Sequence, residues 1–122
     1  MPQNKKTLVI GATPNPTRFA FIATEMLQDY QHEVVLFGIK KGDINGLKIN
    51  NEWPVDQNIN TITLYINATL QEQYYDRILN SGASRIIFNP GTENTELSNL
   101  AKDKNMEALN VCTLVLLRTN QY

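Results

Sequence analysis

The chain has 122 residues, of which 42% are hydrophobic and 19% charged, and this composition is typical of one globular domain spanning residues 1–122. Its formal net charge of −1 excludes a general attraction to nucleic acid, and no apolar run approaches the ~20 residues of a membrane span, so we expect neither as a partner. The single cysteine, Cys112, excludes an internal disulfide and favours a reducing compartment, which predicts a cytoplasmic protein.

Short apolar runs alternate with segments of helical spacing along the chain. Five strands are expected at residues 7–12, 33–38, 61–66, 85–89 and 106–109. After the first run, apolar residues recur at positions i, i+3, i+4, i+7 and i+8, which predicts an amphipathic helix. Its sheet-facing side would consist of Phe19, Ile22, Ala23, Met26 and Leu27.

Three further helices are expected. Residues 70–80 would place Leu70, Tyr74, Ile78 and Leu79 on one side, and Gly82 would end this helix. Residues 95–104 would form a helix with Thr95 as its cap. Residues 111–117 are apolar on all sides, and we interpret them as a short C-terminal helix buried against the sheet.

Strands that alternate with helices form right-handed βαβ units with parallel pairing. We therefore expect an α/β fold: a doubly wound, five-stranded parallel sheet between two layers of helices. The segment 39–60 is long for a connection without a helix. Because it contains Trp53, Ile44, Leu47 and Ile49, we expect an ordered loop that folds back on the edge of the sheet.

In open sheets of this kind, ligands bind in the loops that follow the carboxyl ends of the strands. The first such loop, residues 11–18, leads into a helix whose first N–H groups lack internal partners and attract anions. Gly11 allows a sharp turn, Thr13 and Thr17 offer hydroxyls, and Arg18 can reach a phosphate. The loop is not a G-x-G-x-x-G fingerprint, because Thr13 and Pro16 stand at two glycine positions. Alternatively, Thr17 only caps the helix and Arg18 is solvated.

The loop after the second strand carries Lys40 and Lys41. A NAD site needs an acidic residue there for the ribose hydroxyl, whereas lysines suit an additional phosphate on the ribose. CoA has such a phosphate at the 3′ position and NADP at the 2′ position; the alternative is an ordinary basic surface turn. The loop after the fourth strand has Gly91, where the backbone can pass close to a ligand. It also has Glu93, which can bind a ligand or stabilise the next helix.

The remaining reactive side chains form no catalytic pattern. Cys112 is interpreted as a buried small residue, with a reactive thiol at a helix start as the alternative. His32 precedes the second strand, at the opposite end of the sheet, and is expected in a surface turn; Trp53 is expected to fill the core under the long loop. One histidine and one cysteine cannot form a structural zinc site, and no acid–base or nucleophile pair stands out. We therefore expect neither a metal nor catalysis by this chain.

Four segments together resemble the small stand-alone CoA-binding domain family: VIGATPNPTRFAFIATEML, EVVLFGIKKGDINGLKI, IIFNPGTENTEL and NVCTLVLL. This Rossmann-like unit is similar to the N-terminal CoA-binding domain of the succinyl-CoA synthetase α subunit. The resemblance implies that the first loop lines the pyrophosphate and pantetheine side, through Gly11, Ala12, Thr13, Asn15, Pro16, Thr17 and Arg18. It also implies that Lys40 and Lys41 meet the ribose phosphate and that Asn89, Pro90 and Gly91 form the far wall. One departure is Ile39, where the family has a proline before the loop lysine.

These observations predict a non-catalytic module that binds CoA or acyl-CoA. Two alternatives are a subunit of an acyl-CoA ligase that works with a partner chain, and an NADP-binding regulator. Ligase chemistry by this chain alone is not expected, because it needs a phosphorylated histidine in a further domain and His32 is misplaced. A structural protein without a ligand, a protein partner and a homodimer all stay open.

Overall fold

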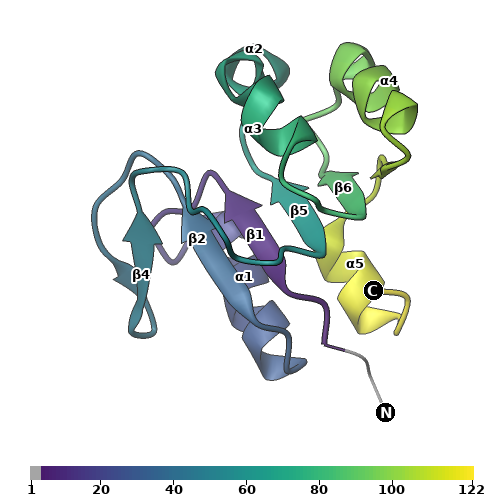
Figure 1. The fold of residues 1–122 in the computed structure, drawn as a ribbon. Helices are drawn as coiled ribbons and strands as arrows, with labels where there is room; N and C mark the ends of the chain where they lie inside the picture. The colour runs from purple at the N-terminus through teal and green to yellow at the C-terminus, as the bar shows by residue number, and fades with distance from the viewer. Residues whose placement is uncertain (1–3) are drawn as a thin grey trace.

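The computed structural model describes residues 4–122, and in this range an α/β sheet of seven strands is flanked by helices (Figure 1). The strands are β1 (Thr7–Ile10), β2 (Val34–Phe37), β3 (Asp43–Ile44), β4 (Leu47–Asn50), β5 (Thr61–Leu64), β6 (Arg85–Phe88) and β7 (Glu107–Leu109). Their order in the sheet is β3-β4-β2-β1-β5-β6-β7, and every pair is parallel except β3–β4. The expected doubly wound α/β fold is confirmed, with more strands than the sequence predicted.

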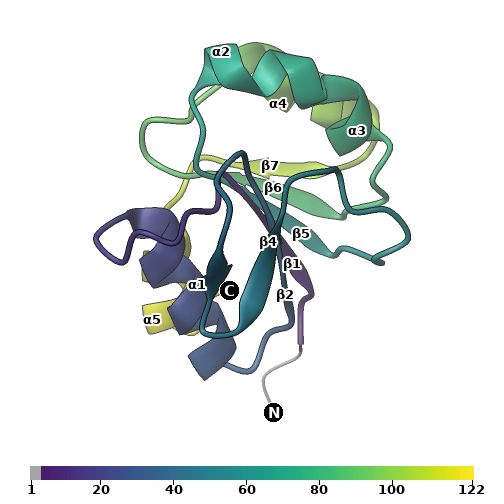
Figure 2. The ribbon, with the colours of Figure 1, turned by 90° about the vertical axis from the view of Figure 1, so that its left-hand side faces the viewer.

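The helices cover both faces of the sheet. They are α1 (Phe19–Asp29), α2 (Ala68–Gln71), α3 (Tyr75–Leu79), α4 (Thr95–Asp103) and α5 (Thr113–Arg118), with one 3₁₀ turn (Glu72–Tyr74) between α2 and α3. Helices α1 and α5 lie on one face and α2, α3 and α4 on the other (Figure 2). None of the helices described in residues 4–122 has the length and hydropathy needed to cross a bilayer.

The segment 39–60, expected as an irregular loop, contains the hairpin β3–β4. Its turn is Asn45-Gly46, with φ of 51° and 86°, the positive values that a two-residue hairpin turn requires. Ile44 and Ile49 of this hairpin are fully buried, so the segment does fold back on the edge of the sheet. The prediction of five strands was wrong because Asn45-Gly46 forms a tight turn between apolar residues, which pairs β3 with β4.

The core forms two layers because alternate residues of the central strands face opposite sides. In β1, Leu8 and Ile10 pack in the layer under α3 and α4, whereas Val9 packs in the layer under α1 and α5. All four residues of β1, β5 and β6 are buried. Strands covered on both faces appear in a sequence as continuous apolar runs, which is why these strands were predictable.

Three expectations for the helices were wrong. Helix α1 buries Ala20, Ala23, Thr24 and Leu27, whereas Phe19 is 68% exposed and Ile22 and Met26 are half-buried, so the buried stripe is rotated from the expected one. The expected helix 70–80 is a series of short turns that starts at Ala68, and Leu70 is exposed. The cap of α4 is the side chain of Asn94, which accepts from the N–H of Leu97 at 3.1 Å, rather than Thr95.

The amino end of the sheet holds a buried polar cluster around Tyr122. The phenol ring lies 4.8 Å from the His32 ring and 4.3 Å from the guanidinium carbon of Arg85. His32 is buried, and its Nδ1 accepts a hydrogen bond from the N–H of Lys5 at 2.9 Å. The predicted surface turn is present, with Gln31 exposed at φ 67°, but the prediction was wrong for the side chain of His32, which packs on Tyr122.

Candidate functional site

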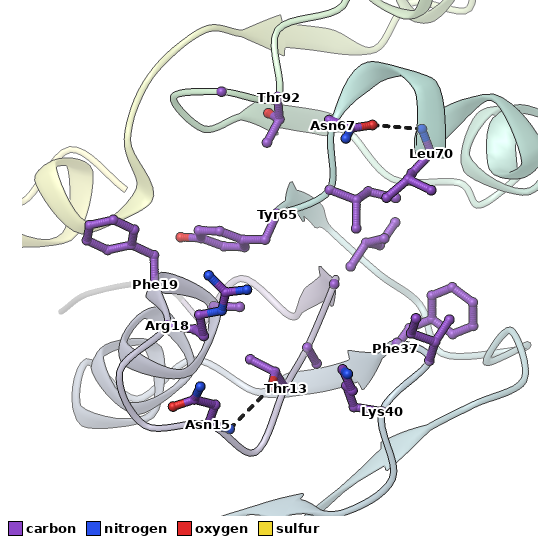
Figure 3. A pocket seen from close by; sticks show the side chains of 18 of the residues that line it. Thr13, Asn15, Arg18, Phe19, Phe37, Lys40, Tyr65, Asn67, Leu70 and Thr92 are labelled. Carbon is purple, nitrogen blue, oxygen red and sulfur yellow. Dashed lines mark hydrogen bonds between the residues drawn. The ribbon is translucent and has the colours of Figure 1, made fainter.

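A cleft of about 900 Å³ lies at the carboxyl edge of the sheet, where β1, β2, β5 and β6 end (Figure 3). This volume is near the upper end of the range for small-molecule sites, so the cleft suits a large ligand. Four loops form its walls. The lining residues are Ile10 to Asn15, Thr17 to Ala20, Phe37 to Lys41, Tyr65 to Asn67, Leu70, Gln73, Tyr74 and Pro90 to Thr92.

The start of α1 is open to the cleft. Its N-cap residue, Arg18, makes no capping side-chain hydrogen bond, whereas Asn67 caps α2 and Asn94 caps α4. Phe19 and Ala20, whose N–H groups belong to the first turn, line the cleft. The free N–H groups and the helix dipole therefore favour an anion at this point.

Side chains in the first loop stabilise its shape. The Asn15 Oδ1 accepts from the N–H of Thr17 at 3.0 Å and from its hydroxyl at 2.8 Å, and the Thr13 Oγ1 accepts from the N–H of Asn15 at 3.2 Å. Thr17 therefore does not cap α1; its hydroxyl is engaged by Asn15. Pro16 is exposed and lies outside the cleft lining.

The charges around the cleft have one sign. Arg18, Lys40 and Lys41 line it, and no aspartate or glutamate among residues 4–122 does so. The whole chain has a net charge of −1, so the positive charge is a local property of this site. Such a lining favours an anionic ligand.

Two glycines allow the loops to pack directly on one another. A Cβ on Gly38 would lie 2.6 Å from the backbone oxygen of Ala12, which joins the loop after β2 to the loop after β1. Gly11 has φ of 96°, and a Cβ there would lie 2.9 Å from Ile66 Cγ2 and 3.0 Å from the Tyr65 backbone. The absence of these side chains thus makes room for the neighbouring loops.

The residues of the loop after β6 have two roles: some stabilise the fold and others line the cleft. Asn89 is buried below the cleft and does not line it. Its Nδ2 donates to Thr63 Oγ1 at 2.7 Å and to the Leu64 carbonyl at 2.8 Å, and its Oδ1 accepts from the N–H of Thr113 at 2.8 Å. Pro90 and Gly91 do line the cleft. All the site residues predicted from the sequence except Pro16 and Asn89 are therefore brought together here.

The wall after β5 was largely missed by the sequence reasoning. It consists of Tyr65, Ile66, Asn67, Leu70, Gln73 and Tyr74, and Thr92 completes it from the loop after β6. The only indication in the sequence that this segment belongs to the site was its position, since Asn67 follows the third predicted strand. Aromatic, aliphatic and amide side chains of this kind are equally common in cores and on helix surfaces.

Tyr65 has a buried hydroxyl with no hydrogen-bond partner in the described part of the chain. Burial raises the pKa of this phenol well above its usual value. The adjacent hydroxyls of Thr63 and Thr113 oppose the shift, but they hydrogen bond with one another at 2.8 Å. The phenol is therefore protonated at neutral pH, and Tyr65 contributes a neutral surface to the cleft.

An aromatic cluster supports the other end of the cleft. The Phe37 ring lies 5.1 Å from the Trp53 ring and 5.2 Å from the Tyr74 ring. Phe37 and Tyr74 line the cleft, whereas Trp53 lies outside the lining; it is half-buried and packs against the core, so it fills the core only in part. Trp53 is the only tryptophan of the chain, so its fluorescence reports on this end of the cleft.

The other candidate reactive groups lie outside the cleft lining. Glu93 accepts from the N–H of Gly91 at 2.8 Å, and half-buried Cys112 precedes α5. His32 is at the opposite edge of the sheet. Within residues 4–122, no three histidine, cysteine, aspartate or glutamate side chains gather closely enough to hold a metal ion.

The fold and the cleft define a doubly wound α/β protein with a ligand site at the carboxyl edge of its sheet. A family model described as "CoA binding domain" matches residues 5–118. The chain therefore belongs to the CoA-binding domain family.

Solved structures agree with this assignment. An uncharacterised protein is 43% identical, with a TM-score of 0.95 over 98% of this chain and 99% of that one. A hypothetical protein from Pyrococcus horikoshii OT3 is 24% identical, with a TM-score of 0.87 over 96% and 84% of the two chains. A protein from Thermus thermophilus is 14% identical, with a TM-score of 0.80 over 98% and 91%, and these last two show the fold alone. No functionally curated protein matches the sequence.

Proposed function

We propose that this protein binds CoA or its thioesters in the cleft and does not transform them by itself. The observation that carries the proposal is the cleft lining, which contains three cations and, within residues 4–122, no carboxylate. CoA has phosphates both at its pyrophosphate and on its ribose, so it matches a lining with cations in two loops. Membership of the CoA-binding domain family supports the same ligand.

In this proposal the pyrophosphate lies at the open N-terminus of α1, beside Arg18. Free N–H groups and the helix dipole hold it without a dedicated capping residue. The ribose phosphate lies at Lys40 and Lys41, in the loop after β2. Gly11, Ala12, Thr13 and Gly91 contribute backbone and small side chains around the ligand.

The absence of catalysis is proposed from the same lining. Among the described residues it offers no histidine, cysteine, aspartate or glutamate, the groups that most often move protons or attack a substrate. Acyl-CoA ligase chemistry would then depend on residues from a partner chain.

NADP is the competing ligand, because its 2′-phosphate would also suit Lys40 and Lys41. The two ligands separate in a calorimetric titration of the protein with CoA, dephospho-CoA, NADP and NAD at moderate salt. We expect CoA to bind most tightly. Preference for NADP over CoA, or binding of none of the four, would overturn the proposal.

The double variant Lys40→Ala/Lys41→Ala tests the placement of the ribose phosphate. Two charge-assisted contacts at an exposed site contribute together about 1.5–3 kcal/mol, which is about 10–100-fold in the Kd of CoA. Dephospho-CoA should lose much less. The control Lys48→Ala/Lys102→Ala removes the same charge from exposed positions outside the cleft and should change neither Kd appreciably. Equal losses for CoA and dephospho-CoA would place the phosphate elsewhere.

A further inference from the structure

One end of the cleft has both of its lysines beside exposed apolar side chains. Lys40 and Lys41 directly follow Ile39, which lines the cleft and is 83% exposed. Leu70 of α2 lines the same cleft and is 48% exposed. Figure 3 shows Lys40 and Leu70 toward one side of the cleft, with Arg18 toward the other. We call the end with the two lysines the β2 end, since both lysines follow β2.

Contacts between the wall residues hold the β2 end together. Phe37, two residues before Ile39, has its ring 5.2 Å from the ring of Tyr74. Gln73 precedes Tyr74 and donates from its Nε2 to the Leu70 carbonyl oxygen at 3.1 Å. All five side chains line the cleft, so together with the lysines they form the wall of the β2 end.

The packing of the core does not account for Ile39 and Leu70. Neither side chain belongs to the two core layers, whereas the neighbouring lining residues Tyr65, Ile66 and Tyr74 do pack on them. Both side chains leave apolar surface open to solvent beside two charged lysines. Covering such surface with a ligand is favourable, because apolar area is removed from water. The β2 end therefore suits a ligand that carries a charged group and an apolar group close together.

We infer that the β2 end binds the base of the nucleotide, with the faces of the base against Ile39 and Leu70, and that it selects adenine. The inference rests on the proposed CoA site. In CoA the base and the 3′-phosphate are attached to the same ribose, so a phosphate held by Lys40 and Lys41 keeps the base at the same end of the cleft. The faces of a base are apolar and its edge is polar, which matches a wall of aliphatic side chains with one amide.

The amide of Gln73 provides the selection for adenine. Its Nε2 is engaged by the Leu70 carbonyl, and no group of residues 4–122 donates to its Oε1, which stays free as an acceptor. The 6-amino group of adenine donates a hydrogen bond, whereas hypoxanthine has a carbonyl oxygen at the same position. An acceptor opposite an acceptor repels, so the same pocket disfavours hypoxanthine although the two bases have nearly the same shape.

The test uses three probes that share the ribose phosphates and differ only in the base. They are adenosine 3′,5′-bisphosphate, inosine 3′,5′-bisphosphate and the abasic tetrahydrofuran 3′,5′-bisphosphate, and each is titrated by calorimetry beside CoA. We expect the adenosine probe to bind at least about tenfold more tightly than either of the others. Tenfold corresponds to ~1.4 kcal/mol, which is less than full burial of one isoleucine side chain provides.

Each outcome of these titrations has one meaning. Equal Kd values for the adenosine and abasic probes would overturn this inference and leave the proposed function intact. Equal Kd values for the adenosine and inosine probes would overturn the selection for adenine. Binding of CoA without binding of the adenosine probe would overturn the inference alone. Failure of CoA itself to bind would overturn the proposed function, and this inference with it.

The variant Ile39→Ser tests the contact with the face of the base. It should weaken the adenosine and inosine probes alike, by at least about fivefold or ~1 kcal/mol, and should leave the abasic probe unchanged. The matched control is Val55→Ser, because Val55 is 68% exposed and lies outside the cleft lining, and it should change none of the three Kd values. An equal loss for the abasic probe in Ile39→Ser would overturn the contact, since it would show that Ile39 only shapes the lysine loop.

The variant Gln73→Leu tests the selection for adenine. It should bring the Kd values of the adenosine and inosine probes close to one another and should leave the abasic probe unchanged. The matched control is Gln121→Leu, the same change at an exposed position outside the cleft lining, which should keep the tenfold ratio. A ratio that survives Gln73→Leu would overturn the role of this amide.

Discussion

Replacing Asn89 with alanine should destabilise the protein severely without removing a ligand contact. The buried amide makes three hydrogen bonds of 2.7–2.8 Å, with Thr63, Leu64 and Thr113. Alanine removes all three and leaves the Leu64 carbonyl and the Thr113 N–H without these partners. At about 1 kcal/mol for each bond, with the added cost of unpaired buried groups, we expect the free energy of unfolding to fall by about 3–5 kcal/mol. That is a large fraction of the ~5–15 kcal/mol typical of a small protein.

The assay is urea unfolding followed through the fluorescence of Trp53, which is half-buried and packs against Phe37. The control is Asn99→Ala, the same change at an exposed position of α4, which should alter the free energy of unfolding by no more than about 0.5 kcal/mol. A stable Asn89→Ala protein with weakened CoA binding would refute the reasoning, because it would show that the amide serves the ligand rather than the fold.

The variant Asn89→Asp separates the two functions of the amide. An aspartate keeps the acceptor for the Thr113 N–H but places an oxygen opposite the Leu64 carbonyl, where the Nδ2 donor had been. Protonation restores a donor, so the carboxyl should have a higher pKa in the folded state than the ~3.9 of an unfolded chain. The stability of this variant should therefore increase as the pH falls through the folded-state pKa.

Two further predictions concern the edges of the sheet. Burial, followed by the positive charges of Lys5 and Arg85, lowers the pKa of His32 below its usual ~6.5, so the folded state prefers the neutral ring. The contribution of His32 to the free energy of unfolding should be complete above pH ~6.5 and should decrease as the pH falls below it. The variant His32→Asn retains an acceptor for the Lys5 N–H, and it should reduce this pH dependence of the free energy of unfolding, measured by urea unfolding at several pH values. Gly38→Ala should cost about 1–3 kcal/mol, because its Cβ would lie 2.6 Å from the backbone oxygen of Ala12. A Gly38→Ala protein that unfolds at the wild-type urea concentration would contradict this close contact.

The central strands could be predicted because each is covered on both faces. They are rich in β-branched and aliphatic residues, and the expected strands at residues 61–66 and 85–89 overlap β5 and β6. The hairpin β3–β4 has short strands at the sheet edge, and of their residues only Ile44 and Ile49 are buried. There the turn chemistry of Asn45-Gly46 carries the information, rather than hydrophobicity.

The direction of single side chains was less predictable than the elements that carry them. Helical spacing identified α1, but which stripe of α1 faces the sheet depends on where the helix begins relative to the edge. Phe19 is a large apolar residue at the start of α1, yet it is exposed, and Ala20 packs inward in its place. The burial of the His32 ring likewise depends on its contact with Tyr122, which is far away in the sequence and is connected to His32 by no local pattern.

The polar residues of the predicted site fall into two physical classes once their hydrogen bonds are known. The amide oxygen of Asn15 is engaged by Thr17, and the amide of Asn89 by Thr63, Leu64 and Thr113, so these side chains fix the shape of the loops. Arg18, Lys40 and Lys41 are exposed at the cleft, and α1 starts without a capping side chain. A rigid loop that leaves its cations and N–H groups free is organised before a ligand arrives, which lowers the entropy cost of binding. Polar residues of both classes therefore contribute to affinity, and separate measurements of stability and Kd for each substitution test this division.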